Sequence, residues 1–390
     1  MNVEAPIRAE DYALTCKLQW LALLLTPGVG AGRGRKLLEH FQDLGRLFAA
    51  SLTELEAVGL PAAAAQAIGT GKSLELAAEE YDHARESGAA VIVPGDPQYP
   101  RRLLEIYDPP LALYLKGDTE VIQKPGISVV GTRRPTPYGV SMAERLACDL
   151  AARGLIIFSG MARGIDTAAH RGALNAHGRT VAIWGTGIDE VYPKENRKIA
   201  DQILEAGGAI VTEFPLGTFP APQNFPVRNR IISGISLGTL VIEAAEYSGT
   251  RVTARCALEQ GREVFAVPGN VTNKNSWGPN TLIKQGAALV ATWEDVWEEL
   301  PAEVRLALTP PEQLASAEPT AASLFDGAQL PPSEKRVVAM LKVDESTHLD
   351  QIVERLNAYL SSSEIFEALF ELELAGRIKA LPGKYYVRAM

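Results

Sequence analysis

Residues 155–170 read LIIFSGMARGIDTAAH. The first four are apolar, as expected of a strand that is buried on both faces, and a glycine-bearing turn then leads into helical sequence. Glycine lets backbone amides approach an anion closely, and the free amides at the start of a helix favour negative charge. This stretch therefore predicts a strand, a turn and a helix of an α/β domain, with an anion site at the turn.

The same pattern recurs along the middle of the chain, where short apolar runs rich in valine and isoleucine alternate with helical sequence. The predicted strands are 90–93, 127–130, 155–158, 180–184, 209–211, 238–242 and 263–267, and the predicted helices are 139–153, 164–176, 196–205 and 253–260. This alternation is typical of a doubly wound, mostly parallel sheet, which binds ligands at the carboxyl ends of its strands.

Four of the predicted strands end in polar turns that contain glycine. These turns are 131–139, 159–166, 185–189 and 243–253. Because the carboxyl ends of parallel strands meet at one edge of a sheet, we expect the four turns to converge. Each turn alone is a weak signal, but together with arginines such as Arg133 and Arg163 they predict a site for an anionic ligand.

A proline-rich segment, 214–226, interrupts the alternation and runs into Arg228, Asn229 and Arg230. Aromatic rings beside guanidinium groups suit single-stranded nucleic acid, because the rings stack on bases and the guanidinium groups hold phosphates. Stacking contributes roughly 1–3 kcal/mol per base, so the single ring of Phe225 would matter. Phe225 could equally anchor the loop to the core, and the sequence leaves both interpretations open.

Composition restricts the class of protein. The chain has 390 residues, 46% hydrophobic and 22% charged, which is typical of a globular protein with more than one domain. No apolar run approaches the roughly 20 residues of a membrane span, and the charged residues Glu4 and Arg8 predict that no secretory signal is present. Three cysteines without metal-like spacing favour a reducing cytoplasm over a disulfide scaffold or a zinc site.

The net charge of −9 is unevenly distributed. Residues 124–290 contain 18 lysines and arginines against 13 acidic residues, which gives +5, whereas the regions on either side are acidic. A basic middle region is compatible with a local site for a polyanion, because binding of a polyanion depends on the electrostatic field at the binding surface rather than on the net charge of the whole chain. Ordinary variation in charge along a chain explains the same numbers.

Residues 1–88 are expected to form a helical domain. The α/β domain is expected to follow it at residues 89–300. Within the helical domain, Gly28-Val29-Gly30 separates two predicted helices, and basic residues follow. This pattern is typical of a helix-hairpin-helix, whose free backbone amides can face a phosphate. A purely structural helical bundle fits the sequence as well.

Residues 301–330 are rich in proline and alanine and are predicted to be a linker. Three helices and a hairpin are predicted within 331–390, which describes a winged helix. The third of these helices contains Glu364, Glu367, Glu371 and Glu373 and no basic residue before Arg377. Because such a helix would repel phosphates, we expect it to contact protein rather than the major groove.

Several catalytic chemistries are disfavoured by the sequence. Asp166 and His170 are one helical turn apart but lack a third metal ligand at a recognisable spacing, so we expect a hydrogen-bonded pair and no metal. A G-x-S-x-G nucleophile motif and a phosphate-binding loop with its lysine are both absent. Ser159 and Gly160 occupy the place of the carboxylate that would bind the ribose of NAD, so we expect no cofactor.

The motifs together resemble those of one family. They are Ser159-Gly160-x-Ala162-Arg163-Gly164-Ile165-Asp166, Gly185-Thr186-Gly187-x-Asp189 with Tyr192-Pro193-x-x-Asn196, Phe225-Pro226-x-Arg228-Asn229-Arg230, Glu243-Ala244 with Ser248-Gly249-Thr250, and Val267-Pro268-Gly269. This combination is similar to the signature of the DNA-processing protein A family (DprA/Smf). The resemblance covers about residues 90–290.

The resemblance implies an extended Rossmann-like domain between an N-terminal SAM-like or helix-hairpin-helix-like domain and a C-terminal winged helix. It implies a dimeric, non-enzymatic protein that binds single-stranded DNA without sequence preference and helps to load a RecA-type recombinase in natural transformation and recombination. Its implied DNA contacts are Arg133, Arg134, Gly160, Arg163 and Asn196, then Phe225, Arg228, Asn229 and Arg230, and finally Ser248, Gly249 and Thr253. By the same analogy, Leu282, Ile283 and Leu289 would lie near the dimer interface, although core burial explains them equally well.

Two points qualify the resemblance. The loop 222–224 lacks a lysine that some members of the family place there, which puts one contact in doubt. The Rossmann-like domain also resembles that of the lysine-decarboxylase-like nucleotide phosphoribohydrolases, which are the alternative. Those enzymes need a glutamate where this chain has Thr253, and they need a glycine pair that is missing here.

Overall fold

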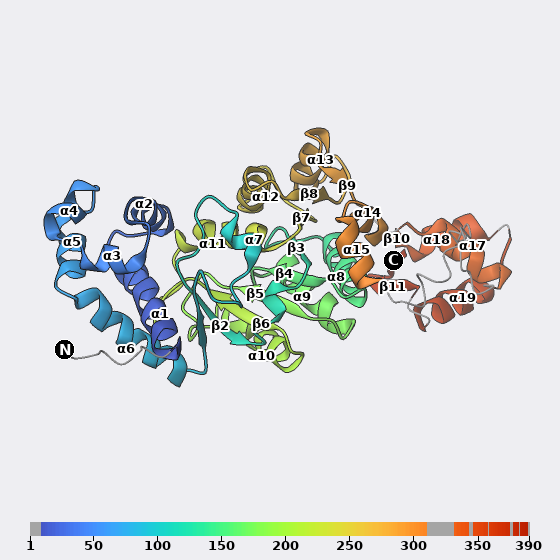
Figure 1. Cartoon of the computed structure of the whole chain (residues 1–390). Helices are drawn as coiled ribbons and strands as arrows, with labels where there is room; N and C mark the ends of the chain where they lie inside the picture. Colours follow the sequence, from blue (N-terminus) through green and yellow to red (C-terminus); the bar gives the residue numbers. More distant parts are fainter. Residues whose placement is uncertain are drawn as a thin grey trace. The chain divides into compact units, whose positions relative to one another are not determined.

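The computed structural model describes residues 9–309, 331–342, 346–357, 359–374, 377–381 and 383–388. The chain divides into two compact units, residues 1–309 and 310–390. Among the described residues, the first unit has six N-terminal helices followed by an α/β domain, and the second has three helices and a small sheet (Figure 1).

The N-terminal helices are α1 (Ala9–Leu25), α2 (Ala31–Phe41), α3 (Leu44–Ala49), α4 (Leu52–Ala57), α5 (Ala62–Gly69) and α6 (Lys72–Glu86). Their starts follow from local chemistry. The Asp43 side chain accepts a hydrogen bond from the amide of Arg46, and Ser51 and Glu54 form a reciprocal capping box. A cluster that includes Leu23, Leu37 and Leu55 closes the bundle. Two helices, α1 and α2, thus flank the turn at Gly28. Whether this turn binds phosphate as a helix-hairpin-helix does stays a prediction.

A nine-stranded sheet forms the centre of the first unit, in the order β1-β2-β6-β5-β4-β3-β7-β8-β9. Its strands are β1 (Ala90–Ile92), β2 (Leu113–Gly117), β3 (Gly126–Val130), β4 (Ile156–Ser159), β5 (Thr180–Ile183), β6 (Ala209–Thr212), β7 (Gly238–Val241), β8 (Glu263–Ala266) and β9 (Ala288–Leu289). From β6 to β9 all neighbours pair in parallel, whereas β1 and β2 join antiparallel. The predicted doubly wound, mostly parallel sheet is confirmed. The direction of winding reverses between β3 and β7, which is where such sheets bind ligands.

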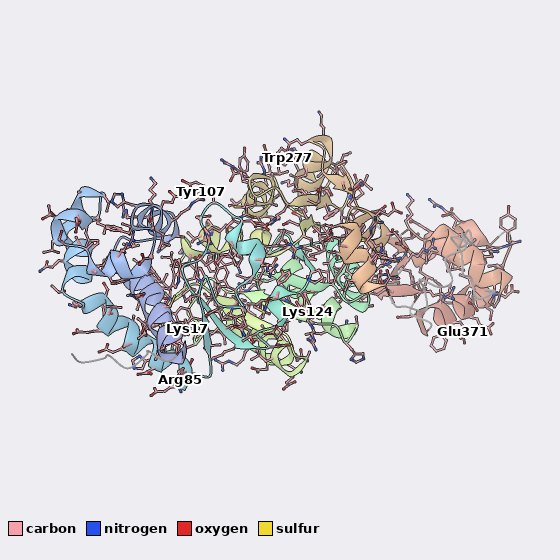
Figure 2. The ribbon with its side chains drawn as sticks, viewed as in Figure 1. Lys17, Arg85, Tyr107, Lys124, Trp277 and Glu371 are labelled. Carbon is pink, nitrogen blue, oxygen red and sulfur yellow. The ribbon has the colours of Figure 1, made fainter. Side chains whose placement is uncertain are left out.

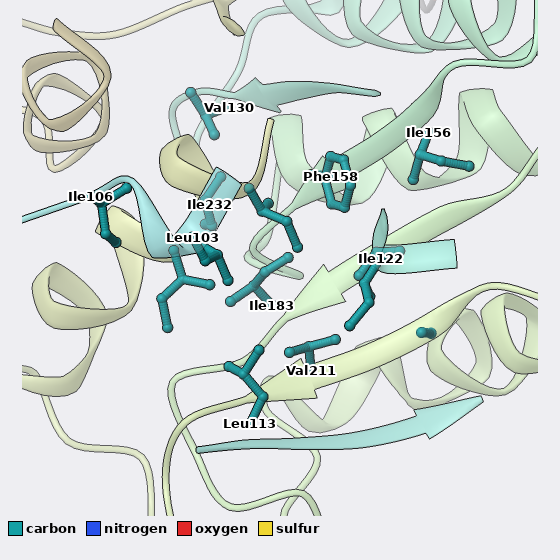
Figure 3. Packing of buried hydrophobic residues seen from close by; sticks show 14 of the residues in the cluster. Leu103, Ile106, Leu113, Ile122, Val130, Ile156, Phe158, Ile183, Val211 and Ile232 are labelled. Atoms are coloured by element: carbon teal, nitrogen blue, oxygen red, sulfur yellow. The ribbon is translucent and has the colours of Figure 1, made fainter. Parts of the chain in front are cut away.

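Helices cover both faces of the sheet: α7 (Arg101–Leu104), α8 (Pro137–Ala152), α9 (Ile165–Asn175), α10 (Arg197–Glu205), α11 (Asn224–Ile235), α12 (Thr250–Glu259), α13 (Trp277–Lys284), α14 (Trp293–Glu298) and α15 (Ala302–Leu308). Side chains alternate between the faces along each strand. In β4, Ile156 and Phe158 belong to the layer beneath α11 and α12, whereas Ile157 packs in the layer of α8 and α9. Figure 3 shows the first layer, where Ile232 of α11 lies near Ile183.

Several elements of this unit differ from the sequence-based expectation. Strands β2 and β9 were not predicted, and helix α11 begins at Asn224, inside the segment judged too proline-rich for a buried element. Pro226 is tolerated there because the first turn of a helix does not use its amide hydrogens. Helix α15 occupies the start of the predicted linker, and Leu308 packs on the core, while residues 310–330 lie outside the described residues.

The second unit contains α17 (Pro332–Met340), α18 (Leu349–Leu356) and α19 (Ser362–Leu374), with a sheet of β10 (Thr347–His348), β12 (Tyr385–Arg388) and β11 (Ile378–Leu381). Val337, Ile352 and Ile365, one from each helix, are fully buried in its core. Three helices and a strand hairpin confirm the predicted winged helix.

Among the described residues, no helix combines the length and the apolar character that crossing a membrane requires.

Candidate nucleic-acid interface

A cavity of about 1170 Å³ lies where several strands of the central sheet end. It is lined by residues after β3 (131–134), after β4 (Ala162 and Asp166), after β7 (245–250) and after β8 (Lys274, Asn275 and Trp277), together with the start of α11. The turns after β3 and β7 meet here at the point where the sheet reverses its winding. Eight of the twelve residues predicted from the sequence line this cavity: Arg133, Arg134, Phe225, Arg228, Asn229, Ser248, Gly249 and Thr253.

Arg133 and Arg134 are exposed cations of the cavity wall, as is Lys274. The guanidinium carbon of Arg133 lies 5.3 Å from the centre of the Phe225 ring, within range of a cation–π contact. Within the described part of the chain, no carboxylate forms an ion pair with either arginine. Their charges are therefore available to an anionic ligand.

A buried carboxylate holds the loop that carries these two arginines. Glu243, at the end of β7, is 1% exposed. It accepts hydrogen bonds from the amide of Thr136 (2.9 Å), from the Thr136 hydroxyl (2.5 Å) and from the Asn275 side-chain amide (3.3 Å). Asn275 also donates to the carbonyl of Arg134 at 3.0 Å. Because Thr136 caps α8, this network fixes both ends of the segment 134–136 and positions the arginines.

The Phe225 ring is half-buried, and it still lines the cavity. It packs against Gly185, where an added Cβ would come within 3.0 Å of the ring, and against Tyr192, whose ring centre is 5.6 Å away. One part of the ring is thus anchored while another part faces the cavity. Both sequence-based interpretations of Phe225, a loop anchor and a stacking surface, are compatible with this placement.

Arg228 lines the cavity but is only 4% exposed. Its guanidinium group donates to the carbonyl of Gly160 at 2.7 Å and to the carbonyl of Ile183. An added Cβ at Gly160 would lie 2.5 Å from this group, so glycine is needed there for Arg228 to reach the strand ends. Gly160 therefore serves the cavity through Arg228.

Three other predicted residues lie outside the cavity lining, and each already has partners. The Arg230 guanidinium is buried and paired with Glu213 (2.5 Å) and Asp108 (3.0 Å). The Asn196 side chain is buried and donates to the Met161 carbonyl and to the Thr167 hydroxyl. Arg163 is exposed and pairs with Glu195. Arg230 and Asn196 thus have partners inside the protein, and their contact with phosphate stays a prediction.

Asp166 and His170 do not form the pair expected from the sequence. Asp166 accepts hydrogen bonds from the amides of Gly160 and Ala162. The His170 Nδ1 atom lies 2.7 Å from the Thr180 hydroxyl, which itself donates to the Ile157 carbonyl. The hydroxyl must then accept from Nδ1–H. Burial, with a smaller contribution from the charge of Arg228, lowers the pKa of His170 to about 3, so the ring is neutral at pH 7 and carries its proton on Nδ1. The groups of His, Cys, Asp and Glu in the described residues include no candidate metal site.

Comparison with known proteins decides the family. A model described as DNA recombination-mediator protein A matches residues 90–301, more than half of the chain. The chain belongs to this family. A second model, the DprA winged helix domain, matches residues 314–384. The resemblance drawn from the sequence motifs is thereby confirmed.

Relatives that match over most of the chain support the assignment. Protein Smf of Escherichia coli (strain K12) is 43% identical over 297 residues, which cover 75% of this chain and 76% of that protein. Protein Smf of Synechocystis sp. is 33% identical over 395 residues, 95% of this chain and 98% of that protein. The X-ray structure of DNA processing protein A from Streptococcus pneumoniae superposes with a TM-score of 0.65 and 32% identity, over 73% of this chain and 98% of that one.

Beyond the predicted residues, other side chains of this family member line the cavity. Tyr192, Tyr247, Trp277 and Lys274 are among them. Tyr192 lies within a motif that sequence reasoning had quoted, and Tyr247 lies in the turn after β7, so attention to aromatic residues in those turns would have found both. Trp277 follows a strand end whose turn had not been counted, and nothing in its local sequence indicated a site.

Proposed function

We propose that the protein binds single-stranded DNA in this cavity without sequence preference and acts as a recombination mediator. The observation that carries the proposal is the pair of unpaired arginines, Arg133 and Arg134, beside the Phe225 ring at the reversal point of the sheet. Guanidinium groups bind phosphates, and a ring that faces the cavity stacks on a base only when that base is not paired inside a duplex. Family membership supports the same conclusion.

The proposal is tested by gel shift with single-stranded and double-stranded oligonucleotides over a series of salt concentrations. Single strands should bind more tightly, and the logarithm of the affinity should fall with the logarithm of salt by about 0.7 per phosphate contact, because each contact releases counterions. Equal affinity for the duplex, or affinity that does not respond to salt, would argue against the cavity as a single-strand site.

We propose further that the protein works without catalysis of its own, as a cytoplasmic homodimer that delivers DNA to a RecA-type recombinase. The hydrolase alternative needs a glutamate at position 253, where this chain has Thr253, which is 2% exposed. Incubation with nucleoside monophosphates should therefore release no free base. Release of free base at a rate proportional to the protein concentration would support the hydrolase alternative instead.

For the dimer, β9 supports the sequence analogy. It is the last strand of the sheet, and Leu289 within it is 49% exposed. Leu282 packs partly on the core and serves the fold, and Ile283 is half-buried. Leu289→Arg should convert a dimer into a monomer in light scattering with unchanged circular dichroism, since a charge on an interface is strongly unfavourable. A dimer that survives this change would place the interface elsewhere.

Glu243→Ala is expected to weaken DNA binding although Glu243 does not line the cavity. Removing the carboxylate frees Thr136 and Asn275 and lets the Arg133–Arg134 loop move. The loss of affinity should largely disappear when both arginines are already alanine, because residues that act through one another are not additive. Glu243→Gln, which keeps most of the hydrogen bonds, should retain more affinity than alanine. Additive losses in the cycle would show that Glu243 acts independently of the arginines.

Asp166 should make DNA affinity depend on pH. Burial raises the pKa of this carboxyl to about 6, against the opposing influence of Arg228, the amides of Ala162 and Gly160, and Arg133. Bound phosphate would favour the neutral acid further, so binding takes up a proton and affinity should fall severalfold as pH rises through about 6. The same sign holds for folding, because the native state binds more protons than the unfolded chain above pH 4 or so. Asp166→Asn should flatten the affinity profile between about pH 5 and 7, and an unchanged profile would assign the pH dependence to another group.

A further inference from the structure

The cavity has a second aromatic side that the proposed function does not use. Tyr247, in the turn after β7, is 93% exposed, and Trp277, the first residue of α13, is 38% exposed. Both line the same cavity as Phe225 and Arg133 (Trp277 is labelled in Figure 2). Large apolar side chains at the rim of a cavity indicate a binding surface more strongly than single exposed rings elsewhere.

The backbone beneath these two rings is firmly held. The amide of Gly278 donates to the carbonyl of Ala244 at 2.8 Å, and the amide of Ala244 donates to the carbonyl of Asn275 at 2.7 Å. An added Cβ at Gly278 would lie 2.6 Å from the Ala244 carbonyl oxygen, so glycine permits this close approach of α13 to the turn. The start of α13 and the turn that contains Tyr247 are therefore fixed to each other.

Arg251 joins the two rings more directly. Its guanidinium carbon lies 5.0 Å from the centre of the Trp277 ring, and its Nη1 donates to the carbonyl of Glu246 at 2.7 Å. The arginine thus links Trp277 to the residue before Tyr247. A cation–π contact orients the indole ring without covering all of it, as its 38% exposure shows.

The order of strands places this pair apart from the first aromatic side. On the first aromatic side, Tyr192 packs on Phe225 and follows β5. The two arginines follow β3. On the second side, Tyr247 follows β7 and Trp277 follows β8. From β5 to β8 the sheet advances by four positions, through β4, β3 and β7, or about 19 Å at about 4.8 Å per strand. This distance exceeds the roughly 3.4 Å between successive nucleotides of a stacked strand several times over. Strand β3, which precedes the arginines, lies between the strands that precede the two sets of rings.

We propose that Tyr247 and Trp277 form a second base-stacking surface, so that one DNA strand is held by rings on both sides of Arg133 and Arg134. This inference rests on the proposed function and extends it to a site for several consecutive nucleotides. Stacking does not depend on base identity, because every base has a π face, so the added surface lengthens the site and keeps it unspecific.

The test uses the full-length protein and an oligothymidine of about 12 nucleotides, which is long enough to reach both surfaces. Tyr247→Ala should lower affinity about tenfold, and the loss should multiply with that of Phe225→Ala in the double variant, since the two surfaces act separately. Tyr247→Phe, which keeps the ring, should bind like the wild type. Because the Tyr247 side chain is almost wholly in solvent, neither of the two changes at Tyr247 should disturb folding.

A strand of the same length that carries phosphates and sugars but no bases provides the control. Wild type and Tyr247→Ala should bind it equally, because only the phosphate contacts remain. Trp277 supplies a second readout: oligothymidine should quench the tryptophan fluorescence of the wild type, and Trp277→Phe should lose most of that change while retaining affinity.

If Tyr247→Ala binds oligothymidine as tightly as the wild type and Trp277→Phe shows undiminished quenching, the second surface is refuted while the proposed function stands. A loss with Tyr247→Ala that is equally large on the strand without bases would also overturn stacking. Failure of the wild-type protein to bind any single strand would instead refute the proposed function, and this inference with it.

Discussion

Replacing both Arg133 and Arg134 with alanine should lower the affinity for single-stranded DNA by at least about 100-fold at low salt. A hydrogen bond to a charged group contributes about 1.5–3 kcal/mol, and two of them account for a loss of this size. The salt dependence should also become shallower, by about 0.7 in the slope for each phosphate contact that is removed. The loss should be the same for every base composition, because phosphates carry no sequence information.

A matched variant separates the site from the overall charge. Arg46 and Arg85 lie on α3 and α6, away from the cavity lining, and both are exposed. The double change Arg46→Ala and Arg85→Ala removes the same net charge, and it should alter affinity only slightly. Equal losses in the two double variants would mean that DNA responds to the charge of the whole protein rather than to this cavity. A loss confined to certain bases would contradict unspecific binding.

Much of this arrangement follows from the sequence by simple rules. Apolar runs that alternate with helices fix a mostly parallel sheet, and such a sheet brings the turns after its strands to one edge. That rule places the turn with Arg133 at the sheet edge, beside the turn after β7. Phe225 lies in the segment that interrupts the alternation, and the family resemblance, rather than the rule, placed it in the same site; the Arg133 guanidinium carbon lies 5.3 Å from the centre of its ring.

Those rules could not predict the direction in which each side chain points. Arg228 and Arg230 belong to one basic motif, but two residues along a helix differ by about 200° in direction. Arg228 consequently reaches the strand ends beside the cavity, whereas Arg230 turns toward Glu213 and Asp108. The start of α11 had not been predicted, so its faces could not be assigned. Asn196 shows the same limit, since its buried partners come from the turn after β4 and from α9.

Arg230→Ala is consequently expected to act on stability, lowering the free energy of unfolding by about 3–5 kcal/mol. The Glu213 side chain is 8% exposed and the Arg230 side chain 9%. Truncating the arginine leaves a carboxylate buried without its cation, which is far costlier than losing an exposed pair. Burial already raises the pKa of Glu213, and Arg230 opposes that effect by its charge and its hydrogen bond. Without Arg230, the carboxyl must take up a proton or the site must open.

Urea unfolding followed by tryptophan fluorescence measures the stability of the structural unit that contains Arg230, residues 1–309. All five tryptophans lie in that unit: Trp20, Trp184, Trp277, Trp293 and Trp297. Arg255→Ala is the matched control: its pair with Glu259 is 80% and 60% exposed, and its loss should leave the free energy of unfolding nearly unchanged. The double variant Arg230→Met with Glu213→Leu should recover much of the stability, since apolar residues can replace a buried pair. The folded fraction of Arg230→Ala should retain most of its DNA affinity. A stable Arg230→Ala protein that no longer binds DNA would instead return Arg230 to the phosphate contacts that its sequence motif indicated.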